Sequence, residues 1–113
     1  MNAPDPPLHD YATERVANAR ADIALAARLV ADPGMDLAEA RTVLLRLTVE
    51  RTFLTAHLST VADRIARMPT VDQSEAVAQE LRPLTMAVEG AALALARLRR
   101  AVANIETRIG VLR

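Results

Sequence analysis

Apolar residues recur at alternating steps of three and four along three stretches of the chain. This spacing places them on one side of an α-helix. The first stretch covers about residues 8–31, the second 37–68 and the third 71–112. Pro33 and Gly34 separate the first two, since a Pro-Gly pair favours a turn. The pattern therefore predicts three helices joined by two short turns.

The second predicted helix has a start signal and a stop signal in the sequence. Asp36 can cap its amino-terminal end, and Glu39 follows three residues later, as in a capping box. Pro69 ends the helix because proline cannot continue it. A further capping box within residues 70–75 opens the third helix.

Short turns favour antiparallel neighbours in helical proteins. We therefore predict an all-α fold, an antiparallel up-down-up three-helix bundle. Residues 8–113 would form this single domain, after a flexible, proline-rich tail at residues 1–7. Composition supports this fold, because Ala and Leu favour helices and the only aromatic residues are Tyr11 and Phe53.

The third helix carries the most regular pattern. Its apolar positions keep a 4-3 spacing over five heptads, which is typical of a coiled-coil or long-bundle seam. Pro83 lies off this seam, and the pattern continues through it in phase. Although proline costs about 3 kcal/mol inside a helix, we expect one continuous helix with a kink near Pro83. The seam consists of Val77, Leu81, Leu84, Val88, Ala91, Leu95, Leu98, Val102, Ile105, Ile109 and Leu112.

The apolar residues at the carboxyl-terminal end of this seam would be exposed to solvent unless another segment covered them. At about 1.5 Å per residue, a helix folded back from the second turn should outrun the second helix near Ala103 or Asn104. A second chain would then cover the remaining apolar residues, either an identical subunit, with a dimer favoured, or a helix of another protein. The alternatives are that residues 31–36 fold over the seam or that the last turns fray. The predicted interface consists of Leu98, Val102, Ile105, Ile109 and Leu112, with a second patch at Met86 and Leu93.

One charged residue interrupts the apolar stripe of the second helix. Arg51 stands between Leu47 and Leu54, where a charge must be paired or must reach solvent. Counting through the turns places it opposite Glu89 on the third helix and near Glu14 on the first. We therefore predict that Arg51, paired with Glu89 or Glu14, is a buried polar group that fixes helix register. A buried ligand contact is the alternative.

The net charge is zero, but charge is uneven along the chain. Residues 1–40 carry seven acidic residues and three arginines, whereas residues 97–113 carry five arginines and one glutamate. Arginines near a carboxyl-terminal helix end stabilise its dipole, and docking to an acidic surface is the alternative. Nucleic-acid binding is disfavoured by the zero net charge and the lack of interleaved aromatic residues. The candidate anion contacts are Arg97, Arg99, Arg100 and Arg108.

Residues suited to catalysis or metal binding are few. The chain has no cysteine, its histidines are His9 and His57, and it contains neither H-E-x-x-H nor E-x-x-H. We therefore expect no metal, cofactor or small-molecule substrate. Arg51 and His57, six positions apart, resemble the R-x4–6-H signature of HEPN ribonucleases, which are also small and all-α. A ribonuclease would require both side chains in one cleft, but six helical residues separate them by about 120°.

No apolar run approaches the roughly 18 residues of a membrane span, and the first residues lack the pattern of a secretion signal. We therefore expect a cytoplasmic protein. The favoured function is a non-enzymatic interaction module, such as an adaptor, assembly factor or chaperone-like subunit. It would self-associate or dock a partner helix through its third helix. The alternatives are a small subunit that binds anions or nucleic acid and, third, a HEPN-like ribonuclease.

Overall fold

The computed structural model describes residues 8–112, without the side chains of residues 8–12, 72–74, 76, 77, 80, 111 and 112. The predicted tail at residues 1–7 therefore lies outside the described part of the chain.

Three helices account for most of the described residues: α1 (Leu8–Ala31), α2 (Leu37–Ala66) and α3 (Val71–Leu112). Residues 8–112 contain no strand, and each helix packs against both of the others. The prediction of an all-α fold with three packed helices is confirmed.

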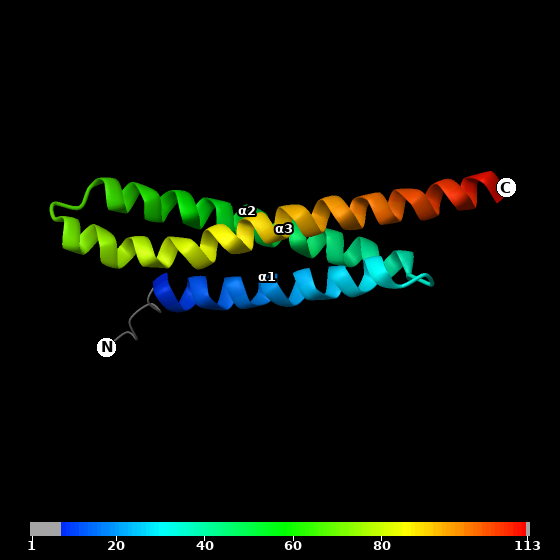
Figure 1. Ribbon diagram of the computed structural model, residues 1–113, viewed down its shortest axis with the longest axis horizontal. Helices are drawn as coiled ribbons and strands as arrows, with labels where there is room; N and C mark the ends of the chain where they lie inside the picture. Colours follow the sequence, from blue (N-terminus) through cyan, green and yellow to red (C-terminus); the bar gives the residue numbers. More distant parts are fainter. Residues whose placement is uncertain (1–7, 113) are drawn as a thin grey trace, which may run out of the picture.

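The third helix sets the length of the molecule. Its 42 residues, at about 1.5 Å each, match the longest dimension of 63 Å. The chain reverses direction at residues 32–36 and again at residues 67–70 (Figure 1). Helix α1 lies along only part of α3, so α2 and α3 extend together past the start of α1 (Figure 1).

The first turn is held by two aspartates. Asp32 Oδ1 accepts a hydrogen bond from the backbone N–H of Gly34 at 2.8 Å. Asp36 Oδ1 accepts from the N–H groups of Ala38 at 2.9 Å and Glu39 at 3.4 Å, which satisfies donors that a helix start leaves unpaired. Asp36 is therefore the cap that the sequence predicted.

The second turn begins slightly earlier than predicted. Helix α2 ends at Ala66, because the N–H of Arg67 bonds to the carbonyl of Arg64 at 3.1 Å and tightens the last turn. Helix α3 begins at Val71, so Thr70 occupies the position that precedes the helix.

Pro83 lies inside α3 without ending it, and the predicted continuity of this helix is confirmed. Pro83 is exposed, off the buried face. Its ring removes a hydrogen bond to the carbonyl of Gln79. Gln79 is exposed as well, so water can bond there instead.

The core forms two clusters along the bundle. Between them on α2 lies Glu50, which follows Leu47 of one cluster and precedes Leu54 of the other. Six of the buried apolar residues are alanines, and five of these are on α1 and α3. Small residues let those two helices approach closely. The larger cluster contains Ala26, Leu29, Met35, Ala40, Val43, Leu47, Ala91, Ala94, Leu95, Leu98 and Val102; the smaller contains Val16, Ala19, Leu54, Val61, Leu84 and Ala87.

Candidate interaction surface

The carboxyl-terminal seam of α3 is covered by the chain itself over most of its length. Leu98 is 0% and Val102 7% exposed, and Ile105 is half-buried against the same core cluster. Met35, from the turn between α1 and α2, is buried in that cluster, so this turn folds over the seam. Leu98 and Val102 are therefore core residues and not the interface residues that the sequence predicted.

Figure 1 shows the carboxyl-terminal end of α3 extending past the start of α2, in agreement with the expectation that α3 outruns α2. Arg41, in the second turn of α2, donates a hydrogen bond from Nη2 to Oε1 of Glu106 at 2.8 Å. Both side chains of this pair are exposed, and residues 106–110 are exposed as well. The bundle therefore gives the last described turns of α3 little cover.

Two predicted interface residues lie beyond this pair. Ile109 is 40% exposed and lines a small hollow with Leu37 at the start of α2. The side chain of Leu112 lies outside the described residues. The predicted overhang is thus reduced to the end of α3.

Glu50, and not Arg51, is the charged residue that α2 places in the bundle. Arg51 is exposed, as are its predicted partners Glu14 and Glu89, whereas the Glu50 side chain is 12% exposed. The prediction that Arg51 is a buried register residue is therefore wrong. The cause is a shift in phase, because the buried face of α2 passes through position 50 at the heptad spacing. That face consists of Ala40, Val43, Leu47, Leu54 and Val61.

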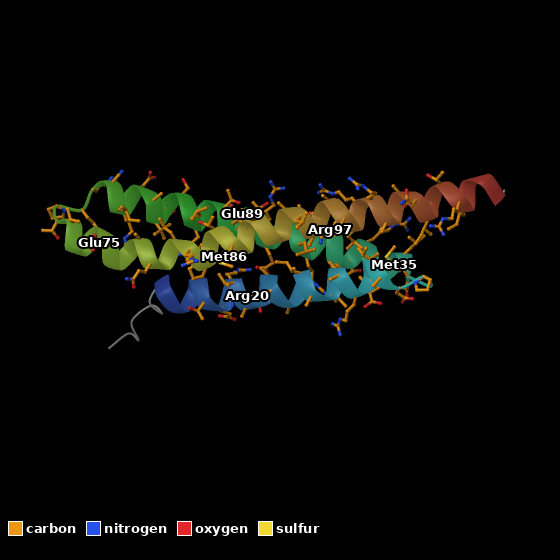
Figure 2. All side chains as sticks on the ribbon, in the orientation of Figure 1. Arg20, Met35, Glu75, Met86, Glu89 and Arg97 are labelled. Atoms are coloured by element: carbon orange, nitrogen blue, oxygen red, sulfur yellow. The ribbon has the colours of Figure 1, made fainter. Side chains whose placement is uncertain are left out.

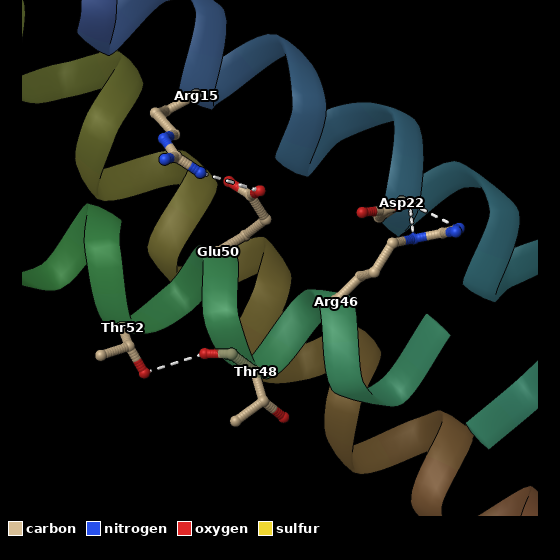
Figure 3. Close-up of polar contacts among 6 residues, drawn as sticks. All are labelled: Arg15, Asp22, Arg46, Thr48, Glu50 and Thr52. Carbon is tan, nitrogen blue, oxygen red and sulfur yellow. Dashed lines mark hydrogen bonds and ion pairs between the residues drawn. The ribbon is translucent and has the colours of Figure 1, made fainter. Parts of the chain in front are cut away.

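Two ion pairs join α1 to α2 (Figure 3). Arg15 Nη1 donates to Glu50 Oε1 at 3.3 Å, and its guanidinium carbon lies 4.5 Å from the centre of the Phe53 ring, within range of a cation–π interaction. Glu50 Oε2 is buried without a hydrogen-bond partner among the described groups. Further along, Asp22 Oδ1 accepts from Arg46 Nε at 3.2 Å and lies 3.1 Å from its Nη2.

An apolar groove lies between α1 and α3. At Gly90 a Cβ atom would lie 3.1 Å from Ile23 Cδ1, so the two helices approach closely there. Leu93 and Val30, which line the groove with Gly90, are 51% and 40% exposed. Met86, one heptad before Leu93, is 58% exposed. Figure 2 shows Met86 on the side of α3 that faces α1. The groove encloses about 230 Å³ and is lined by Ile23, Ala26, Ala27, Val30, Gly90, Leu93, Ala94 and Arg97.

A second hollow, of about 510 Å³, continues this groove toward the turn between α1 and α2. Val30 and Arg97 line both spaces. Arg100 and Arg108 line the second one, whereas Arg99 does not. The structure therefore gathers three of the four candidate arginines. The other lining residues are Leu29, Ala31, Asp32, Pro33, Met35, Ala101, Asn104 and Ile105.

The hollow has an excess of positive charge. Its three arginines are exposed, and none forms an ion pair with another described side chain. The one carboxylate on the lining belongs to Asp32, which already accepts the Gly34 N–H. Helix α1 ends and α2 begins at this turn, so the opposite ends of two helix dipoles meet and offset each other. The dipole of α1 alone therefore does not explain why three arginines gather around this hollow.

Sequence reasoning missed the half of the groove that α1 contributes. Ile23 and Val30 lie one heptad apart, at the spacing that predicts one apolar side of the first helix, so nothing in the sequence marked them as exposed. It also missed Leu45 and Val49 on the outer face of α2, which are 66% and 41% exposed. The available signal was their spacing of four residues, which is out of phase with the stripe.

The residues suited to catalysis are not brought together. Arg51 is exposed and His57 half-buried on one continuous helix, where their spacing separates the side chains by about 120°. The side chain of His9 is not described. No three His, Asp or Glu side chains of the described part gather to hold a metal ion. Within the same residues, no helix combines the length and apolar character that crossing a bilayer requires.

Comparison with known proteins adds no relative. The chain matches no known protein family, no curated protein and no solved structure. Its surface is therefore the basis for inferring a function.

Proposed function

We propose that this chain is a non-enzymatic interaction module that binds a helix of another protein along α3. The observation that carries the proposal is the partial exposure of Leu93, Val30 and Met86 around the groove between α1 and α3. Full burial of a large apolar side chain contributes about 1.5–3 kcal/mol. A helix laid over the groove would gain part of that free energy at each of these residues.

The proposal includes the arrangement of the helices as an antiparallel up-down-up bundle. It is supported by the pairs Arg15–Glu50 and Asp22–Arg46, whose residue numbers change in opposite directions along α1 and α2. The proposal also includes a bend of α3 near Pro83, because a missing backbone hydrogen bond and the proline ring favour a kink there. In this arrangement α1 and α3 present a groove with the length of about two helical turns, along residues 23–30 and 90–97.

A second copy of the chain is a weaker candidate for the partner. The exposed apolar residues of α2 are Leu45, Val49 and Phe53, and their neighbours on that face are threonines and arginines. Such a face would bring arginine against the arginines of the hollow. Like charges at an interface oppose association.

Photo-crosslinking tests the proposal. A photoreactive phenylalanine analogue replaces Met86 or Leu93 in the full chain, in the cells from which the protein comes. We expect each position to yield the same crosslinked protein, because Leu93 lines the groove and Met86 is exposed one heptad earlier on α3. Arg51 and Glu75, both exposed and outside the groove, serve as control positions. Crosslinking at the groove no stronger than at the controls would contradict the proposal.

A second candidate function is association with a small anion or a nucleic acid. It is favoured by one observation, the three arginines without ion pairs around the larger hollow. Binding to phosphates weakens steeply as salt rises, whereas an apolar groove responds little. Titration of the full chain with inorganic phosphate and with a single-stranded oligonucleotide at several salt concentrations therefore separates the two functions.

A further inference from the structure

We propose that the partner helix is acidic and amphipathic. Its apolar residues would occupy the groove between α1 and α3, and its carboxylates would bind Arg97, Arg100 and Arg108. This inference rests on the proposed function and specifies the chemistry of the partner.

The two halves of the binding surface are continuous. Val30 and Arg97 border both the apolar groove and the larger hollow, and Figure 2 shows Met86 and Arg97 along the same side of α3. From Met86 to Arg108 the surface spans 22 residues of α3, which corresponds to about 33 Å. A partner helix of roughly 20 residues would cover it.

The charge of the hollow selects for carboxylates. A guanidinium group offers paired N–H donors that match the two oxygens of a carboxylate. Arg97, Arg100 and Arg108 are exposed without ion pairs to described side chains, and Asp32 alone opposes them on the lining. A basic helix would meet like charges there, so the same residues that bind an acidic partner reject a basic one.

The order of residues along α3 predicts the pattern of the partner. The apolar positions Met86 and Leu93 come first, and the arginines follow from position 97. The partner would therefore carry its carboxylates toward one end and its apolar residues, at steps of three and four, toward the other. A flat lipid surface fits this arrangement less well, because Ile23, Gly90 and Ala94 lie in a concave groove between two helices.

Selection from a peptide library tests the chemistry without assuming a sequence. The full chain is used to select from displayed peptides of about 20 residues, a length set by the surface from Met86 to Arg108, with random residues on a helix-forming background. We expect enriched peptides to combine apolar residues at helical spacing with an Asp or Glu cluster at one end. Enrichment of neutral or basic peptides would overturn the inference.

Variants of the chain then locate the binding site. One enriched peptide, made synthetically, is titrated against the triple variant R97E/R100E/R108E, and we expect at least a tenfold loss of affinity. The matched control R51E/R64E/R99E has the same change in charge at exposed positions outside the groove and hollow, and should bind within about twofold of the parent chain. Replacing the peptide's acidic residues by lysine should restore binding to R97E/R100E/R108E. Equal losses in both triple variants, or no rescue, would overturn the inference.

The variant Leu93→Asp separates this inference from the proposed function. If Leu93→Asp abolishes binding while R97E/R100E/R108E does not weaken it, the groove binds a helix but the acidic preference is wrong. If Leu93→Asp has no effect, both proposals fail. A dimer by light scattering that Leu93→Asp dissociates would identify a second copy as the occupant and overturn the inference. Arginine-dependent sedimentation with phosphatidylserine vesicles, without any enriched peptide, would overturn it in favour of a lipid surface.

Discussion

Two faces of α3 differ in how they are covered. On the face that packs into the bundle, Leu84, Leu95 and Leu98 are at most 1% exposed, whereas Met86 and Leu93 are more than half exposed at the edge toward α1. All five belong to the same continuous helix. The difference therefore comes from the neighbouring helices and not from the helical propensity of α3.

The neighbours differ in side-chain size. Helix α2 offers Leu47, Leu54 and Val61 to the buried face, and these fill the space beside it. Helix α1 contributes Ala19 and Ala26 to the core beside Val16 and Leu29, and a Cβ at Gly90 of α3 would lie 3.1 Å from Ile23 Cδ1 of α1. Small residues bring two backbones close together but do not reach the outer edges of their contact. Close packing of helices can therefore leave an open groove beside a closed seam.

The largest difference in the free energy of unfolding is expected between alanine substitutions at Leu98 and at Leu93. Leu98→Ala removes a fully buried side chain and should lower the free energy of unfolding by about 2–5 kcal/mol. Leu93→Ala should change it by less than about 0.5 kcal/mol, as is usual for exposed positions. Urea denaturation of both variants measures the difference. Similar losses in the two variants would contradict the comparison.

The half-buried and the exposed ion pair should differ in the same way, by a smaller change in the free energy of unfolding. Arg15→Ala would leave the Glu50 carboxylate, 12% exposed, without its partner and should cost about 1–3 kcal/mol, the range for an unpaired buried polar group. Arg41→Ala breaks a pair whose side chains are 61% and 48% exposed and should cost about 0.5 kcal/mol or less. Thermal denaturation compares the two. An equal cost would show that Glu50 is not desolvated.

Removal of the residues after Asn104 tests how much the end of α3 contributes. The shortened chain loses half-buried Ile105 and the pair between Arg41 and Glu106, and should lose about 1–2 kcal/mol of stability on the scale of partial apolar burial. Because the seam is covered within the chain, its mass in solution should match the monomer before and after the cut. A shift from dimer to monomer would show that a second chain covers this end.

The smallest change in stability is expected from a substitution at Gly90, and it should be a gain where the other substitutions give a loss. Gly90→Ala should stabilise the chain by up to about 1 kcal/mol, because alanine favours a helix over glycine. The new Cβ would meet Ile23 Cδ1 at 3.1 Å, and this terminal methyl can move into the groove. Gly110→Ala, with no neighbour within 4 Å, is the matched control. A loss of stability specific to Gly90→Ala would indicate that Ile23 is fixed in place.

The three helices were predictable because their signals are local. The apolar spacing, the Asp36 cap and the Pro33-Gly34 turn each act within a few residues. Register was harder, because Glu50 and Arg51 are one position apart and several nearby leucines fit either phase. Their placement depends on how α2 sits between two neighbours, which is a property of the whole bundle.

The candidate site was only partly predictable. Met86 and Leu93 stood out because their spacing is out of phase with the seam, and their exposure agrees with that signal. Leu98 and Val102 are buried in a cluster with residues of α1, α2 and the turn at Met35, and spacing along α3 alone does not contain the positions of these neighbours. The grouping of Arg97, Arg100 and Arg108 around the first turn required the position of α1, which spacing along α3 does not contain.

Solvent accessibility of individual side chains distinguishes the open groove from the closed seam. A soluble gadolinium chelate broadens NMR signals of methyl groups that solvent can reach, and it can be added to the dilute chain. We expect strong broadening at Leu93 and Val30 and protection at Leu95, Leu98 and Val102. Broadening at Leu98 and Val102 as strong as at Leu93 would contradict this expectation.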